Sequence, residues 1–517
     1  MLFERLYVVL ATGVIAIVVL YANRRWRRHL RDVPGPFWDS FSYVPRLLKT
    51  AYGQRCYIDI DLHRRYGSLV RVGPNEISFS DSSALSQVYS ANTRYEKSDF
   101  YVAFDAKGPH GSMPTVFSTR SEKEHRGLKK PIYGAYTMAV MLELEPLTDD
   151  CIHIFERKID EKISQSRGQV IVLDMNEWLH WYAFDVVMSV SFSKPLGFMQ
   201  QEQDVGGLIA AIEGRLRYTA TVGQAPFLHP YLLGSNLVSK VANYIPALAK
   251  MNTSRRIVQF TADQVNRSDV DQGGKGYIDM LERFKSTGLD GEEISPINVT
   301  VAASGNVFAG SDTTAISLRA LFYYLIKSPR CYDKLVREID DLDQTGQLSG
   351  VVRFTESNEL MPFMQACLKE AMRLHPAVGM PLERVVPEGG ITISGKFIPQ
   401  GTVIGANPWV VARDPAVYGD DVDEFRPERW LEAQQEEKEG DSSRLRAMER
   451  NFLAFGAGSR TCLGKNVSLL EMNKLIPQFL RKYKFELVDP DLKLGMQDYW
   501  FAKQTGLVCK ISPRSHK

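Results

Sequence analysis

The chain has 517 residues, of which 44% are hydrophobic and 24% charged, so it is long enough for a large core and has an ordinary folded composition. Residues 1–32 carry a local charge of +4 within an overall charge of +2, and the slightly acidic remainder argues against nucleic acid as a partner. Six scattered cysteines without a Cys-x-x-Cys pair argue against a disulfide framework and indicate reduced thiols on the cytosolic side.

The N-terminus predicts a membrane anchor. Residues 6–22 carry no charge, and these seventeen residues are near the lower limit for a helix that crosses the hydrocarbon core. Five arginines follow between residues 24 and 31, which predicts a single-pass topology with residues 1–5 in the lumen and the rest of the chain cytosolic. A cleaved signal peptide fits less well, because its basic cluster would precede the apolar run. Residues 23–36 then form a basic flank and a stiff Pro-rich hinge.

One domain is predicted after the hinge, over residues 37–517, and it is mainly α with a minor β portion. Residues 68–72 and 76–79 alternate in polarity around a Gly-Pro-Asn turn, which predicts a hairpin. Helical periods dominate from about Glu122 onward. Strand-like segments return at 391–397 and near the C-terminus.

A long helix is predicted from Pro296, with Ser295 as its N-cap, since no further proline occurs before Pro329. Its middle, residues 309–314, reads Ala-Gly-Ser-Asp-Thr-Thr and is a poor choice for a helix interior. The segment is therefore either a close packing contact with solvent-facing polar residues or part of a functional site.

The strongest chemical signal lies at residues 455–464, which read Phe-Gly-Ala-Gly-Ser-Arg-Thr-Cys-Leu-Gly and precede a helical pattern over 465–483. Gly456 and Gly458 allow a tight turn that brings N–H groups towards a sulfur. The start of a helix favours a thiolate at Cys462. A buried cysteine in a glycine-rich loop is the alternative, whereas the spacing of the glycines excludes a dinucleotide-binding loop.

These ten residues resemble the haem-binding signature of cytochrome P450 enzymes, Phe-x-x-Gly-x-Arg-x-Cys-x-Gly, at every fixed position. The resemblance implies that Cys462 is the ligand of the haem iron. It also implies that Phe455, Arg460 and Gly464 belong to the haem-binding site, with Arg460 paired to an anionic group and Gly464 leaving room for a bulky, flat ligand.

Two further segments resemble the family's buried charge network, in the family's order. Residues 370–373 match its Glu-x-x-Arg motif, and Pro427-Glu428-Arg429 resembles its Pro-Glu-Arg segment. Glu370 and Arg373 share one helix face at this spacing and can pair. The resemblance implies a structural triad of Glu370, Arg373 and Arg429 that is not catalytic. A surface ion pair is the alternative for the first two.

The middle of the long helix is similar to the family's oxygen-activation segment. This implies that Thr313 hydrogen-bonds dioxygen and that Asp312 relays protons, while Ala309 and Gly310 leave room over the iron.

Haem propionates need cationic partners, and Arg460 and Arg384 are the family-like candidates. His125 and Lys129 stand where the family usually has a Trp-x-x-x-Arg pair, and they are the candidates to replace it. This departure leaves the third propionate contact open, and an ordinary exposed histidine is the alternative for His125.

The resemblance covers nearly the whole chain and implies a haem-thiolate monooxygenase with haem b as cofactor, anchored in the endoplasmic reticulum membrane. Because no flavin-binding region is apparent, NADPH would act through a separate cytochrome P450 reductase, with cytochrome b5 as a further candidate partner. The reaction would insert one oxygen atom of dioxygen into a small molecule. Two rival classes stay open: a haem-thiolate isomerase or dehydratase without a reductase, and a non-catalytic membrane carrier of haem or lipid.

The substrate is only coarsely indicated. By resemblance, residues 101–116, 303–309, 377–382 and 500–505 form the walls of the pocket. Their aromatic and aliphatic residues suggest an apolar small molecule; they include Phe104, Phe117, Phe308, Val378 and Trp500. Residues 72–79 and 97–101 look like those of filamentous-fungal members similar to pisatin demethylase, which favours hydroxylation or O-demethylation of a secondary metabolite.

Overall fold

The computed structural model describes residues 2–26, 30–108, 111–168, 170–270, 277–286 and 295–514. Most of the described chain is helical, and the strands are short, so the predicted mainly α class with a minor β portion is confirmed. The helices of the N-terminal half are α1 (Leu2–Arg25), α2 (Val44–Ala51), α3 (Arg55–Tyr66), α4 (Ser82–Val88), α5 (Glu122–Lys129), α6 (Met138–Glu143), α7 (Glu145–Gln165), α8 (Met175–Phe192), α9 (Phe198–Gln201), α10 (Leu208–Val222), α11 (Asn236–Ala242), α12 (Pro246–Ala249) and α13 (Ser254–Val270).

The helices of the C-terminal half are α14 (Met280–Ser286), α15 (Pro296–Lys327), α16 (Pro329–Gln344), α17 (Phe354–Leu360), α18 (Pro362–Leu374), α19 (Pro408–Val411), α20 (Pro415–Tyr418), α21 (Glu428–Lys438), α22 (Ser443–Asn451) and α23 (Lys465–Lys482). The predicted long helix is confirmed by α15, which spans 32 residues. The Ser295 hydroxyl accepts a hydrogen bond from the Asn298 N–H, as an N-cap should.

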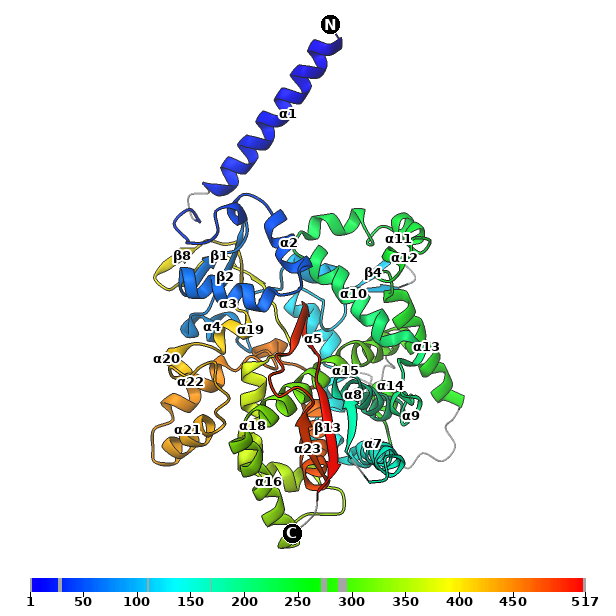
Figure 1. Cartoon of the computed structure of the whole chain (residues 1–517). Helices are drawn as coiled ribbons and strands as arrows, with labels where there is room; N and C mark the ends of the chain where they lie inside the picture. Colours follow the sequence, from blue (N-terminus) through cyan, green and yellow to red (C-terminus); the bar gives the residue numbers. More distant parts are fainter. Residues whose placement is uncertain are drawn as a thin grey trace.

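The centre of the fold is the packing of α15 against α8. Almost every residue of α8 is buried, so this helix is covered on all sides and not only along one stripe. Helices α18 and α23 also contact α15, and the main hydrophobic core runs through these four helices. Figure 1 shows α15 in the middle of the body.

The strands form small sheets at the periphery of the helical body. They are β1 (Leu69–Arg71), β2 (Glu76–Phe79), β3 (Ala106–Gly108), β4 (Gly111–Met113), β5 (Ile171–Asp174), β6 (Arg384–Val385), β7 (Ile391–Ile393), β8 (Lys396–Ile398), β9 (Val403–Gly405), β10 (Tyr483–Leu487), β11 (Gly495–Tyr499), β12 (Phe501–Thr505) and β13 (Val508–Pro513). The largest sheet has the order β1-β2-β9-β6, and only its β2–β9 pair is parallel. The predicted hairpin is confirmed, because Leu69 pairs with Phe79 across β1 and β2.

The N-terminal segment is helical where the anchor is predicted. Figure 1 shows α1 extending away from the rest of the chain. Within the ranges that the structure describes, no helix combines the length and the apolarity needed to cross a membrane, so the anchor over residues 6–22 stays a prediction. The predicted hinge packs against β1, because the Arg71 N–H donates to the Pro34 carbonyl at 2.7 Å. A side chain at Gly35 would collide with the Arg71 carbonyl oxygen at 2.3 Å.

One buried carboxyl makes the fold pH-sensitive. The Asp498 side chain is fully buried, and its Oδ2 accepts the Cys56 N–H at 2.9 Å. Burial raises the pKa of Asp498 from 3.8 to about 7, and the charge of Asp59 adds to this increase. The folded state therefore binds this proton more tightly than the unfolded state, so its contribution to stability is full below about pH 4 and is lost as the pH rises towards 7.

We expect Asp498→Asn to stabilise the protein at neutral pH and not at pH 4, because an amide carries no charge to bury. The difference in the free energy of unfolding between the variant and the wild type should grow by about 1 kcal/mol for each unit by which the pH rises from 4 to 7. Thermal midpoints measured from pH 4 to 7 test this, with the exposed Asp491→Asn as the matched control. A constant difference across the pH range would contradict the prediction.

Candidate functional site

A cavity of about 450 Å³ lies between α15 and the loop that precedes α23. Its other walls come from the 3₁₀ segment η2 (Asp99–Phe104), from residues 113–117, and from α8, α10 and α13. All five apolar residues singled out in the sequence line this cavity, namely Phe104, Phe117, Phe308, Val378 and Trp500. Two residues of the predicted 101–116 wall, 109 and 110, lie outside the described residues.

Cys462 lies on the wall of this cavity. Of the six cysteines, all of them within the described ranges, it alone is exposed, and the exposure is towards the cavity. The Cys462 N–H donates to the Phe455 carbonyl at 2.8 Å, which closes the loop and fixes the direction of the side chain. Burial raises the pKa of the thiol, while the backbone N–H groups of Gly464 and Lys465 bond to the sulfur and lower it. The sulfur is thus presented to the cavity by two N–H groups at the start of α23.

Glycine is required at different positions of the loop for different structural reasons. Gly456 and Gly458 both have a φ of +65°, which other residues rarely adopt. A side chain at Gly458 would also collide with the Tyr89 carbonyl oxygen at 2.2 Å. At Gly464 a side chain would stand 3.9 Å from the Cys462 sulfur, within the cavity wall. The predicted tight turn is therefore present, and Gly464 keeps the space beside the sulfur open.

Three cationic side chains meet at one edge of the cavity. Arg384 is buried over the ring of Tyr89, and its Nε has no hydrogen-bond partner among the described residues. Arg460 is bound to Glu122 at 2.6 Å and to the Thr119 carbonyl at 2.9 Å. The third cation is Lys97, which sequence reasoning missed as a site residue.

The Lys97 ammonium donates to the Phe117 carbonyl at 2.5 Å and lies 4.0 Å from the centre of the Tyr101 ring, with no carboxylate partner among the described residues. Burial lowers the pKa of Lys97 well below its ordinary value, and the charges of Arg384 and Arg460 lower it further. Arg460 is paired with Glu122, whereas Lys97 and Arg384 form no ion pair with a carboxylate among the described residues, and buried positive charge is costly without an anion. A haem-thiolate site needs one cysteine ligand and partners for two propionates, and this cavity offers Cys462 and the three cations, so the residues present fit that group.

His125 and Lys129, the two predicted replacements on α5, are separated by the fold. His125 lines the cavity and is buried, and its Nδ1 has no hydrogen-bond partner among the described residues. Burial, and next the charge of Arg460, lower the pKa of His125 to about 4, so it is a neutral hydrogen-bond donor at pH 7 and not a cation. Lys129 is not among the residues that line the cavity. Its ammonium donates to the Ser459 carbonyl at 3.3 Å and lies over the Tyr133 ring.

The central segment of α15 divides between the cavity and α8. Thr313 lines the cavity, and its hydroxyl donates to the Ala309 carbonyl at 2.9 Å. Asp312 is turned to the other side, where its Oδ1 lies 2.5 Å from the Nε2 of the buried His180 on α8. Burial raises the pKa of Asp312, but the charge and hydrogen bond of His180 outweigh it, and the net pKa is lowered. Gly310 has a packing reason, because a side chain there would come within 2.8 Å of Val187 on α8.

The predicted triad of Glu370, Arg373 and Arg429 is fully buried. Glu370 accepts two hydrogen bonds from Arg373, at 2.8 and 2.9 Å, and one from the Arg429 Nε at 2.9 Å. It also accepts one from the Trp430 indole at 2.9 Å. The alternative of a surface ion pair between Glu370 and Arg373 is therefore wrong.

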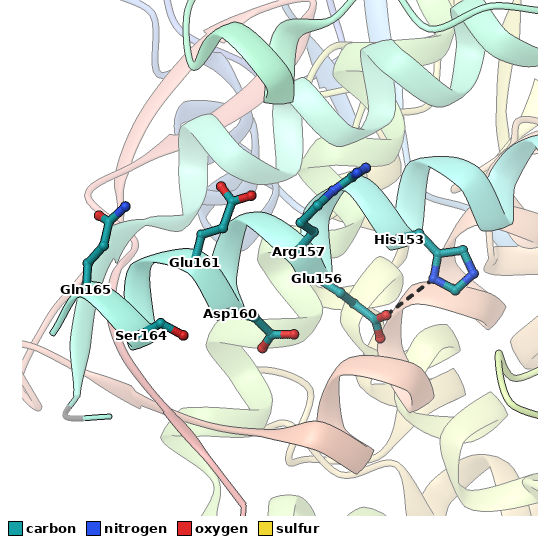
Figure 2. Close-up of a pocket in the computed structure, with 7 residues that line it drawn as sticks. All are labelled: His153, Glu156, Arg157, Asp160, Glu161, Ser164 and Gln165. Carbon is teal, nitrogen blue, oxygen red and sulfur yellow. Dashed lines mark ion pairs between the residues drawn. The ribbon is translucent and has the colours of Figure 1, made fainter. Parts of the chain in front are cut away.

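A second hollow lies along α7 and carries no comparable chemistry. Figure 2 shows that its seven residues come from one face of that single helix. The His153 Nδ1 lies 3.6 Å from the Glu156 carboxylate. The Glu156 carboxylate accepts a hydrogen bond from Gln478 of α23 and forms an ion pair with Lys482 of the same helix, each at 2.8 Å. These contacts hold α7 to α23 and bring no functional residue near Cys462.

Comparison with known proteins gives full-length matches. The family model for cytochrome P450 matches residues 36–515. The chain is 36% identical over 497 residues to the cytochrome P450 monooxygenase cicH of Emericella nidulans, covering 95% of each. It is 35% identical over 515 residues to the cytochrome P450 monooxygenase gsfF of Penicillium aethiopicum, covering 98% of this chain and 99% of that protein. It is also 35% identical over 474 residues to the pisatin demethylase of Fusarium vanettenii, covering 92% of this chain and 87% of the relative.

Proposed function

Because this chain belongs to the cytochrome P450 monooxygenase family, we propose that it binds haem b through Cys462 and hydroxylates or O-demethylates a small molecule of fungal secondary metabolism. The observation that carries this proposal is the Cys462 sulfur, exposed to a largely apolar cavity that has three buried cations at its edge. The fungal origin of the relatives, pisatin demethylase among them, supports the metabolic setting.

We assign the haem propionates to Lys97, Arg384 and Arg460, with neutral His125 as a further hydrogen-bond donor. When bound, the haem supplies the activation of dioxygen, with electrons from NADPH through a separate reductase. Phe455 and Gly464 line the same cavity, and Gly464 places no side chain beside the sulfur. Lys129 acts only indirectly in this arrangement, by holding the loop through the Ser459 carbonyl.

The chain's own residues control protons and water. Thr313 follows Asp312 directly in α15, and its hydroxyl lines the cavity, whereas the Asp312–His180 pair does not. We propose that Asp312, paired with His180, relays protons from solvent to Thr313 and that the Thr313 hydroxyl delivers them into the cavity, where a bound haem would supply the activation of dioxygen. The aromatic wall around Phe104, Phe117 and Trp500, with ring centres 5.4 to 5.7 Å apart, excludes water and holds the body of the substrate.

We expect Thr313→Ala to uncouple the enzyme. NADPH consumption with the reductase should continue while product formation falls by about 100-fold, because the positioned proton donor is lost. The matched control is Thr314→Ala on the next residue, whose hydroxyl bonds the Gly310 carbonyl and Ser468 and does not line the cavity. An isomerase would form product without NADPH and barely respond to either change, so that outcome would replace the monooxygenase proposal.

We also propose attachment to the endoplasmic reticulum membrane through residues 6–22, with the domain in the cytosol. Exposed apolar side chains on the chain after α1, on α2 and around α11 and α12 support a membrane-facing end. They are Phe37, Trp38, Val44, Leu48, Tyr52, Phe227, Tyr231, Leu237, Val241, Tyr244, Ile245 and Leu248. Figure 1 shows α2, α11 and α12 at the end of the body from which α1 extends.

The attachment can be tested by extraction. The full chain should stay in the membrane fraction through an alkaline carbonate wash, whereas a chain lacking residues 1–26 should be released by it. Before the wash, the shortened chain should still bind vesicles through the exposed apolar side chains. Release of the full chain by carbonate would show that residues 6–22 do not span the bilayer.

A further inference from the structure

A buried arginine in the cavity is not explained by haem binding. Arg215 lies on the inward face of α10 and is only 4% exposed, yet it lines the cavity. Its Nη2 donates to the Ala103 carbonyl at 2.6 Å, and its guanidinium lies 5.4 Å from the centre of the Tyr218 ring. Its Nη1 is buried and has no hydrogen-bond partner among the described residues. Guanidinium groups in such places normally bind a carboxylate or phosphate in a forked arrangement.

Two further basic side chains, Lys107 and His229, lie within reach of the charge of Arg215. Burial and then the charge of Arg215 lower the pKa of Lys107 to about 8 and that of His229 to about 4. The nearest acid that acts on Arg215 is Asp105, which forms no ion pair with it and accepts a hydrogen bond from Ser112 at 2.8 Å. Burial lowers the pKa of Arg215 itself to about 10, so the guanidinium remains charged at neutral pH. A charged group in this setting lacks an anion.

Arg215 reaches the cavity from a different element than the three cations of the proposed haem edge. Arg215 comes from α10, whereas Lys97, Arg384 and Arg460 come from the segment before η2, from β6 and from the loop before α23. None of those three is among the charges that shift the pKa of Arg215. Since the propionates are assigned to Lys97, Arg384 and Arg460, the proposed haem site assigns no partner to Arg215.

We propose that Arg215 binds a carboxylate on the substrate. The substrate class is then an apolar, aromatic-compatible molecule with one carboxylate, whose apolar body packs on Phe104, Phe117 and Trp500. This inference rests on the proposed monooxygenase function and deepens it, because it replaces a purely apolar substrate by an acidic one. Arg215 is a specificity-determining residue in this proposal: it holds the acid, and the carbon to be oxidised is then selected by the shape of the cavity.

The test compares an acid with its neutral isostere in the haem-loaded protein. Calorimetric titration with 2-naphthoic acid and 2-naphthamide, and with 4-phenylbenzoic acid and its amide, gives dissociation constants for each pair. In the wild type the acids should bind at least about tenfold more tightly than the amides. Arg215→Gln should abolish the preference, and Arg215→Lys should retain part of it, since it keeps the charge but loses the fork.

Two controls separate recognition from folding. Arg217→Gln lies on the same helix but is exposed, over the ring of Tyr499, and should leave the preference unchanged. The Gln side chain ends two bonds short of the Arg215 Nη2 that donates to the Ala103 carbonyl, so the thermal midpoint of each Arg215 variant is measured as the check on folding. The red-shifted Soret band of the carbon monoxide complex (the carbonyl band), recorded on every variant, shows that the haem–thiolate site is intact.

The outcomes are distinguishable from failure of the proposed function. Without the carbonyl band in the wild type, the monooxygenase proposal fails. With the band present, equal binding of acids and amides, no binding of either acid, or a preference that survives in both Arg215 variants would overturn the role of Arg215 alone.

Discussion

Cys462→Ser should abolish the red-shifted carbonyl Soret band and all NADPH-dependent product formation, while leaving the fold in place. Serine has nearly the same shape as cysteine, and the loop is held by the Cys462 N–H and by two glycines, not by the sulfur. A hydroxyl is far less acidic than a thiol and does not supply the soft anionic ligand that the iron requires. The expected effect is therefore complete loss of function without loss of helical structure.

The measurement is a carbonyl difference spectrum, with circular dichroism as the check on folding. Cys331→Ala is the matched control, because Cys331 is equally a free cysteine but lies buried at the start of α16, away from the cavity. It should retain the band and most of the activity. If the serine variant kept the band, or if both variants lost it, Cys462 would not be the ligand.

The sequence pattern predicted the framework well where local chemistry decides it. The length of α15 follows from a Ser-Pro start and the absence of proline before Pro329, and the β1–β2 hairpin follows from its turn. The tight turn before Cys462 follows from Gly456 and Gly458, because glycine readily adopts the positive φ that this turn requires. These features depend on neighbours in the chain, so a single sequence is enough to find them.

The electrostatic parts of the site could not be predicted in the same way. No motif marked Lys97 or Arg215 as a binding residue, because their roles depend on burial beside the cavity, which only the fold creates. Lys129 fitted the spacing on α5, but the helix turns it towards Ser459. For Gly310 the predicted close packing is confirmed, since its missing side chain makes room for Val187, but Ser311, Asp312 and Thr314 are buried and do not face solvent as that alternative expected.

Asp312 marks the same limit. Adjacent residues on a helix point about 100° apart, so the sequence could not show that Asp312 faces His180 on α8 while Thr313 lines the cavity. The aromatic wall, in contrast, was predicted from family position and lies where expected, because bulky apolar residues at the centre of a fold have few other places to go.

Glu370→Gln should prevent the protein from holding haem at physiological temperature. The change removes the one negative charge that is hydrogen-bonded to both Arg373 and Arg429, and all three side chains are fully buried. Breaking a buried pair by removing one partner costs about 3–5 kcal/mol, a large part of the 5–15 kcal/mol that stabilises a typical domain. Thermal midpoint and haem content should both fall sharply. Glu432→Gln is the control, since its pairs with Arg426 and Arg444 are partly exposed and worth about 1 kcal/mol or less.

A triple replacement of Glu370, Arg373 and Arg429 by apolar residues separates two explanations of the network. A buried ion network that serves only itself can often be replaced by apolar side chains at little cost. Here the arginines also satisfy backbone carbonyls of the segment 412–424: Arg373 binds those of Ala412 and Val422 at 2.8 Å, and Arg429 binds that of Asp421 at 3.0 Å. The triple variant would leave these carbonyls buried and unpaired, so we expect it to be no more stable than Glu370→Gln. If it were instead as stable as the wild type, the network would be a replaceable core element, and the segment 412–424 would be held against α18 by packing alone.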